Sequence, residues 1–115
     1  MGIQNYSERV LLVTLPEQPR QGDELEEAIR MLSEEVNHDV VVDFSSVRML
    51  TSETLCNLVM LDRLVRKFGH LLVLCKVSAE IKHIFVRTGL AAVFEFAKDE
   101  PAALHCIRNR AGLPA

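Results

Sequence analysis

The chain has 115 residues, of which 49% are apolar and 25% carry a formal charge, and its net charge is -3. This length and composition predict one globular domain, residues 1–115, whose core needs neither a disulfide nor a metal. The Lys and Arg residues are scattered among more numerous carboxylates, which argues against a nucleic-acid-binding surface, and no apolar run approaches the roughly 18 residues of a membrane span.

The first predicted elements are a buried strand and an amphipathic helix. The Val- and Leu-rich run at 9–15 is typical of a buried strand. Apolar residues then recur at helical spacing up to Val36, with Asp23 as the predicted N-cap and Asn37 as a left-handed stop. The apolar face of this helix comprises Leu25, Ile29, Leu32 and Val36.

The centre of the chain repeats this order with a stronger strand signal. Residues 39–44, "DVVVDF", are too uniformly apolar for a half-exposed strand and are predicted to form a central parallel strand covered on both faces. A second helix is predicted from Ser52 to Phe68, with Gly69 as its C-terminal stop. Residues 71–75, "LLVLC", repeat the buried-strand pattern.

The last third of the chain predicts two further helices around a short strand. The third helix has Ser78 as its N-cap and Gly89 as its stop. Residues 92–96 are predicted to be an edge strand, and 99–110 a final helix with Pro101 in its first turn. Alternating strands and helices indicate an α/β fold, with a mixed, mostly parallel sheet of four to five strands and about four helices.

Cysteine and histidine spacing gives no sign of a metal or cofactor. The sequence contains no His-x-x-x-His, no Cys-x-x-Cys and no phosphate-binding loop, so we expect neither. The cysteines are odd in number and far apart, which favours a reduced, cytoplasmic protein; they are Cys56, Cys75 and Cys106.

Two adjacent hydroxyls, Thr51 and Ser52, stand where the second helix is predicted to begin. A hydroxyl at this place accepts a hydrogen bond from a free backbone N–H, which is a purely structural role. A phosphate at the same place would be tolerated by the helix but would change any surface that contacts it. The sequence leaves both interpretations open.

The second helix has one apolar stripe for the core and another that faces elsewhere. The predicted core stripe comprises Leu58, Leu61, Val65 and Phe68, with Leu55 at its edge. The second stripe is either covered by a neighbouring helix or is a docking surface beside the hydroxyls. With Glu53, the candidate partner-binding residues are Ser52, Glu53, Cys56, Val59, Met60 and Arg63.

The segment from "VVVDFSSVRMLTSETL" through "GHLLVLC" to "VSAEIKHIFVRTGLAAVFEF" resembles the STAS domain family, the sulfate-transporter and anti-sigma-factor-antagonist fold. The similarity runs from about Val40 to Phe96. It implies a STAS fold, with an additional edge strand formed by 2–8. It also implies a non-enzymatic interaction module that acts in signal transduction and transcription regulation.

The signature loop of that family reads Asp-Ser-Ser-Gly-Leu, and the matching residues here are Thr51-Ser52-Glu53-Thr54-Leu55. The resemblance places Ser52 at the serine that a partner kinase phosphorylates, which releases the kinase. Thr51 replaces the family Asp and is a second candidate acceptor, and Thr54 replaces the Gly. The implied partner is a serine-kinase-type anti-sigma factor or a related regulator.

Two other functions remain open at this stage. The first is an unphosphorylated scaffold subunit of a stressosome-like or lipid-transport complex, and a weak homodimer is a further expectation. The second is a small enzyme or ligand-binding domain that uses Asp39 and Asp43 at the strand ends, where open α/β sheets gather ligands. For Asp43 we favour the simpler role of capping the turn that follows its strand.

Overall fold

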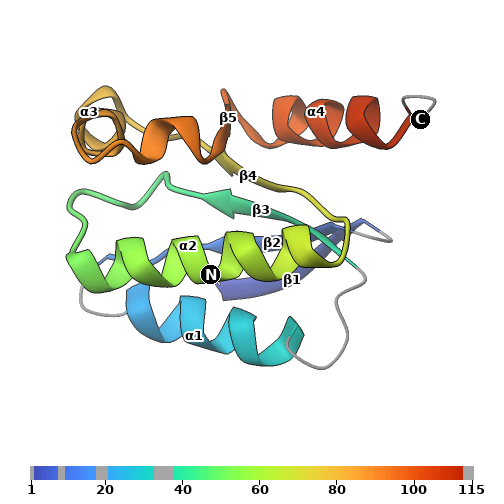
Figure 1. Ribbon diagram of the computed structural model, residues 1–115, viewed down its shortest axis with the longest axis horizontal. Helices are drawn as coiled ribbons and strands as arrows, with labels where there is room; N and C mark the ends of the chain where they lie inside the picture. Colours follow the sequence, from blue (N-terminus) through green and yellow to red (C-terminus); the bar gives the residue numbers. More distant parts are fainter. Residues whose placement is uncertain (1, 8–9, 18–20, 33–37, 113–115) are drawn as a thin grey trace.

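The computed structural model describes residues 2–7, 10–17, 21–32 and 38–112 (Figure 1). Strands and helices follow one another along the chain in the order expected of an α/β fold. The elements are β1 (Gly2–Ser7), β2 (Val10–Thr14), α1 (Gln21–Leu32), β3 (Asp39–Asp43), α2 (Ser52–Lys67), β4 (Leu72–Cys75), α3 (Ala79–Arg87), the 3-10 helix η1 (Leu90–Ala92), β5 (Glu95–Ala97) and α4 (Glu100–Gly112).

The five strands form one mixed sheet in the order β1-β2-β3-β4-β5. β1 pairs antiparallel with β2, whereas β2, β3, β4 and β5 run parallel to one another. β1 is the additional edge strand that the family resemblance implied. The three valines of β3 are fully buried, which confirms the prediction of a central strand from its unbroken apolar run.

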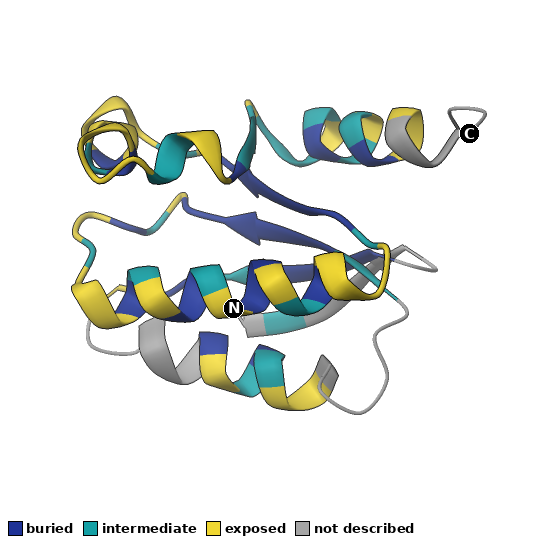
Figure 2. Ribbon diagram, in the orientation of Figure 1, coloured by how far each residue is buried: buried dark blue, intermediate teal, exposed yellow. Residues whose placement is uncertain are grey.

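Helices cover the two faces of the sheet unequally. Alternate residues of each strand point to opposite faces, so Leu72 and Leu74 pack with α1, α2 and α3, while Val73 and Cys75 pack with α4. α2 lies beside α1 (Figure 2), and its buried residues pack with those of the strands. Among the described residues, no helix is both long and apolar enough to cross a membrane.

Phe85 of α3 holds the aromatic centre of the larger core. Its ring is fully buried and makes edge-on contacts with the rings of Phe44, Phe94 and Phe96, at centroid distances of 6.0, 5.6 and 5.5 Å. Such pairs add to the free energy gained from burial alone. They tie α3 to the end of β3, to Phe94 just before β5 and to Phe96 within β5.

Several predicted boundaries are corrected. α1 begins at Gln21, so Asp23 lies inside the helix and is not its N-cap. The predicted end of that helix, 33–37, lies outside the described residues. β5 is shorter than the predicted strand because Ala92 belongs to η1, and only 95–97 pair with β4.

Candidate functional site

A short turn and loop lead from the end of β3 to the start of α2. The Asp43 carboxylate accepts a hydrogen bond from the backbone N–H of Ser45, with an Oδ1–N distance of 2.7 Å, so the predicted capping of this turn is confirmed. Phe44 and Val47 are buried on either side of the turn. These two buried side chains hold the first part of the loop against the core, whereas Arg48 and Met49 after them are exposed.

The hydroxyls of Thr51 and Ser52 have different surroundings: the first caps α2 and the second is exposed. Thr51 is the N-cap of α2, and its Oγ1 accepts from the backbone N–H of Thr54 over 3.2 Å and lies 3.1 Å from the Thr54 Oγ1. Thr54 is fully buried. Ser52 is the first helical residue; it is exposed, and its hydroxyl makes no hydrogen bond to any described residue. The helix thus gets its cap without using the Ser52 side chain.

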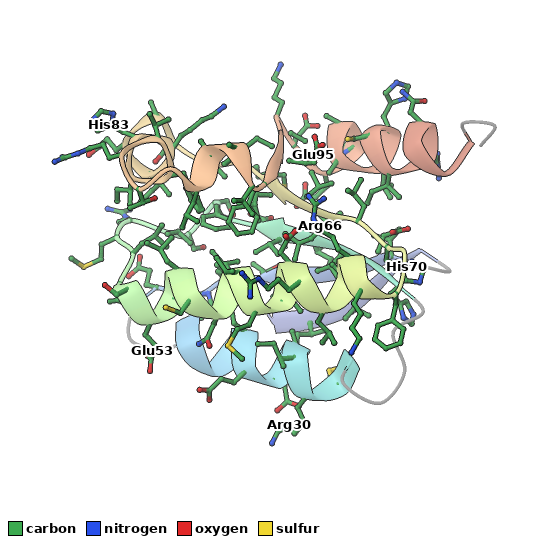
Figure 3. The ribbon with its side chains drawn as sticks, viewed as in Figure 1. Arg30, Glu53, Arg66, His70, His83 and Glu95 are labelled. Atoms are coloured by element: carbon green, nitrogen blue, oxygen red, sulfur yellow. The ribbon has the colours of Figure 1, made fainter. Side chains whose placement is uncertain are left out.

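The α2 stripe, meaning Ser52, Glu53, Cys56, Val59, Met60 and Arg63, is mostly open to solvent in the isolated chain. Five of its members are exposed, and Met60 retains 55% of its accessible surface. Val59 is half-buried because it also packs against the core. Glu53 points to the α1 side of the helix in Figure 3. Because five of its six members are exposed, most of the stripe is uncovered in the described part of the chain.

The prediction that one stripe of α2 is buried in the core is confirmed at three of its four positions. Leu58, Leu61 and Val65 are fully buried, whereas Phe68 is 48% exposed. The prediction for Phe68 is wrong because α2 ends at Lys67, so the C-cap residue no longer follows the helical spacing. The ring instead lies under the Lys67 ammonium, 5.9 Å from the ring centroid to Nζ.

Arg66 fastens the far half of α2 to the segment before β5. Its Nε donates to both carboxylate oxygens of the buried Asp62 at 3.0 Å, and its Nη2 donates to the Val93 carbonyl at 3.2 Å (Figure 3). A two-oxygen contact of this kind holds the guanidinium in one orientation. These contacts anchor the C-terminal half of α2, so the position of its first turn is fixed by the rest of the helix.

A polar group gathers at the carboxyl ends of β3 and β4. We call Asp43, Cys75 and Glu100 the strand-end cluster; their donor atoms all lie within 4.8 Å of one another. The Lys76 Nζ lies 3.2 Å from Glu100 and 4.0 Å from Asp43. Lys76 adopts a positive φ of 56°, a conformation that is uncommon for a residue with a side chain.

Burial and charge shift the pKa values of this group. Burial, reinforced by the neighbouring carboxylates of Asp43 and Glu100, raises the pKa of the Cys75 thiol to about 12. Burial alone would raise the pKa of Asp43, but hydrogen bonding to Glu100 and Ser45 outweighs it and lowers the pKa below 3.8. Hydrogen bonding and attraction to Glu100 raise the pKa of Lys76.

Asp39 and Asp43 do not form one site. They lie at opposite ends of β3, so the expectation that both serve one ligand is wrong. The Asp39 Oδ1 accepts from the Leu71 backbone N–H at 2.8 Å and lies 3.4 Å from the His70 Nδ1 (Figure 3). This carboxylate joins the beginnings of β3 and β4 and has a structural role.

The comparisons with known proteins decide the family. A STAS domain profile matches residues 20–103, which is most of the chain. The chain belongs to the STAS domain family. No curated protein sequence matches this STAS domain at a significant level.

Solved structures share the fold of this STAS domain at low sequence identity. A serine-to-glutamate variant of RsbS from Moorella thermoacetica has a TM-score of 0.83 and 18% identity, with 96% of this chain and 97% of that chain covered. The Bacillus cell-fate determinant SpoIIAA in its phosphorylated form has a TM-score of 0.69 and 12% identity, with 90% of this chain and 96% of that chain covered. A sulfate transporter family protein from Wolinella succinogenes has a TM-score of 0.74 and 16% identity, with 91% of this chain and 88% of that chain covered.

Sequence reasoning missed the strand-end cluster of this STAS domain. No metal-ligand spacing in the sequence signals it, because Glu100 is far along the chain from Cys75 and Asp43. The only usable signal was the register of parallel strands, which places Asp43 directly opposite Cys75. That register was not available from the periodicity of either strand alone.

Proposed function

We propose that this STAS domain is a non-enzymatic, cytoplasmic interaction module that a partner serine kinase switches by phosphorylating Ser52. The partner is an anti-sigma-factor-type kinase or a related regulatory protein, and the chain as a whole, 1–115, is the switching unit. The observation that carries the proposal is that Thr51 caps α2 while the Ser52 hydroxyl is exposed and free of hydrogen bonds to described residues. Thr51 is the less favoured acceptor, since its oxygen is engaged in the cap.

The fold is expected to survive the modification. A phosphoserine carries about -1.5 to -2 charges at neutral pH. At the first residue of α2 this charge lies beside free backbone N–H groups and the positive end of the helix dipole. Glu53 already places one carboxylate in the same turn, so the helix start accommodates negative charge.

The bound partner is expected to be lost. The α2 stripe presents exposed sulfur-containing and apolar side chains next to Ser52, a composition that adapts well to a protein surface. Burying an unpaired phosphate in such a contact costs several kcal/mol. Because each 1.4 kcal/mol changes an affinity about tenfold, one phosphate is enough to dissolve a complex of about micromolar affinity.

A kinase assay with a matched set of variants tests this proposal. Incubation with an anti-sigma-factor-type kinase and ATP should place one phosphate on Ser52, located by mass spectrometry, and none on S52A. In a binding assay S52A should bind the kinase like the unmodified chain, and S52D should bind at least about tenfold more weakly. N109D is the charge control, because it adds one negative charge on α4 across the sheet.

The alternative is a scaffold subunit that is never phosphorylated. It is favoured by the loop itself, where the hydroxyls of Thr51 and Thr54 contact each other in place of the Asp and Gly implied by the resemblance. If S52A and S52D bind every partner equally and no phosphate is incorporated, the scaffold function replaces the switch.

A further inference from the structure

The strand-end cluster combines a thiol and two carboxylates at one point of the sheet edge. Parallel pairing sets Asp43 opposite Cys75 at the ends of β3 and β4. Glu100 reaches the same point from the first turn of α4. Three elements therefore bring one donor atom each to within 4.8 Å of the others, and the backbone fixes all three attachment points.

The burial of this group distinguishes it from an ordinary acidic surface. Cys75 is fully buried and Asp43 is 5% exposed, while the Glu100 side chain retains 19% of its exposure. The Cys75 Sγ has no hydrogen-bond partner among the described residues, although it lies beside two oxygen acceptors. The Cys75 side chain packs with the apolar core beneath α4, and its sulfur lies where that core meets the two carboxylates. A ligand at this boundary can therefore bond to sulfur and oxygen together.

Lys76 shows that positive charge is stabilised at this point. Its ammonium contacts Glu100 and approaches Asp43 from the exposed side. A thiolate and two carboxylates carry three negative charges, and a divalent cation together with Lys76 supplies three positive charges. The ammonium now pairs with the two carboxylates that the cation would bind, so the cation has to displace it from them, and the flexible Lys76 stem lets its head move outward.

We propose that Asp43, Cys75 and Glu100 form a binding site for Zn²⁺ or a similar thiophilic divalent transition metal. Thiolate and carboxylate are both established zinc ligands, whereas Mg²⁺ and Ca²⁺ select oxygen alone. On binding, the Cys75 S–H bond breaks, its proton passes to solvent, and the sulfur forms the metal bond as a thiolate. The fourth position of a tetrahedral zinc is left for water.

The required rearrangement is small. With zinc–oxygen and zinc–sulfur bonds of about 2.1 and 2.3 Å, donors of one tetrahedral ion lie roughly 3.6 Å apart. The partly exposed Glu100 side chain can supply this closure by rotation, since its backbone position at the start of α4 need not move. The Asp43 Oδ1 already accepts from Ser45, so its second oxygen is the one that approaches the metal.

Cobalt titration of the reduced, metal-free chain tests the site, since Co²⁺ bound to a thiolate produces a sulfur-to-metal charge-transfer band. We expect the band in the unmodified chain, its disappearance when Zn²⁺ is added in equal amount, and its absence in C75S. E100Q should weaken Co²⁺ binding at least about tenfold, as for other losses around metal sites. C56S and C106S are the matched controls and should retain both band and affinity.

Any one of three results overturns the proposal. They are the absence of a charge-transfer band in the unmodified chain, a band that persists in C75S, and a Co²⁺ affinity that is unchanged in E100Q. Circular dichroism checks that C75S is folded, and E100Q provides an independent test because its side chain is partly exposed. Kinase binding by S52A and S52D does not depend on this titration, so the two proposals stand or fall separately.

Discussion

Replacement of Thr51 and of Ser52 by Ala should separate a structural hydroxyl from a free one. T51A removes the N-cap bond to Thr54, which is worth about 0.5–2 kcal/mol. It also removes the contact between the two threonine hydroxyls, worth about 0.5–1.5 kcal/mol. The expected loss in unfolding free energy is therefore about 1–3.5 kcal/mol, while S52A should change it by less than about 0.5 kcal/mol.

Urea unfolding followed by circular dichroism measures both values under one set of conditions. A loss of 1 kcal/mol corresponds to a decrease of about 4 °C in melting temperature for a domain of this size, so thermal scans give a second reading. T51S is the matched control, because serine also caps helices and should restore most of the stability. If S52A is as destabilised as T51A, the Ser52 hydroxyl is structural and the argument for its modification is refuted.

Three further predictions concern the core and the strand-end cluster. F85A should lose about 3–5 kcal/mol in urea unfolding, and the exposed V86A should not. Because folding lowers the pKa of Asp43, its carboxylate stabilises the chain at neutral pH, and this contribution disappears as the pH falls below 3.8. The difference in unfolding free energy between the unmodified chain and D43N should therefore be larger at neutral pH than below pH 3.8, as measured by urea unfolding under the two conditions. In the native chain a thiol reagent should modify the exposed Cys56 rapidly and the buried Cys75 only under denaturing conditions, as read by peptide mass spectrometry.

Local patterns predicted most of the fold because the buried strands are unbroken apolar runs and the helices carry apolar residues at helical spacing. The unbroken "VVVDF" run identified the central strand, and Ser78 caps α3 through the Ile81 backbone N–H at 3.2 Å as predicted. Gly89 follows the end of α3 with a φ of 80°, the left-handed conformation expected of a helix stop. The family resemblance added β1, which the residues alone left undetermined.

The candidate site was predictable only where it depends on neighbours in sequence. The pair of hydroxyls before α2 could be found, but which one caps depends on the first helical hydrogen bonds, and these select Thr51. Contacts between distant segments could not be found: Arg66 reaches Val93, and Glu100 reaches the end of β3. Strand register and the docking of α4 create these contacts, and neither is encoded in a short window.

The unequal covering of the sheet has a consequence for how the molecule opens. Three helices lie on one face, and in the described part of the chain α4 covers the other, with Ala103 and Ile107 as its buried contacts. Detachment of α4 would wet one face of β4 and leave the packing of α2 intact, so amide hydrogens in α4 should exchange with solvent deuterium sooner than those of α2. Such subglobal unfolding would leave α2 in place while the opposite face of the sheet becomes transiently accessible.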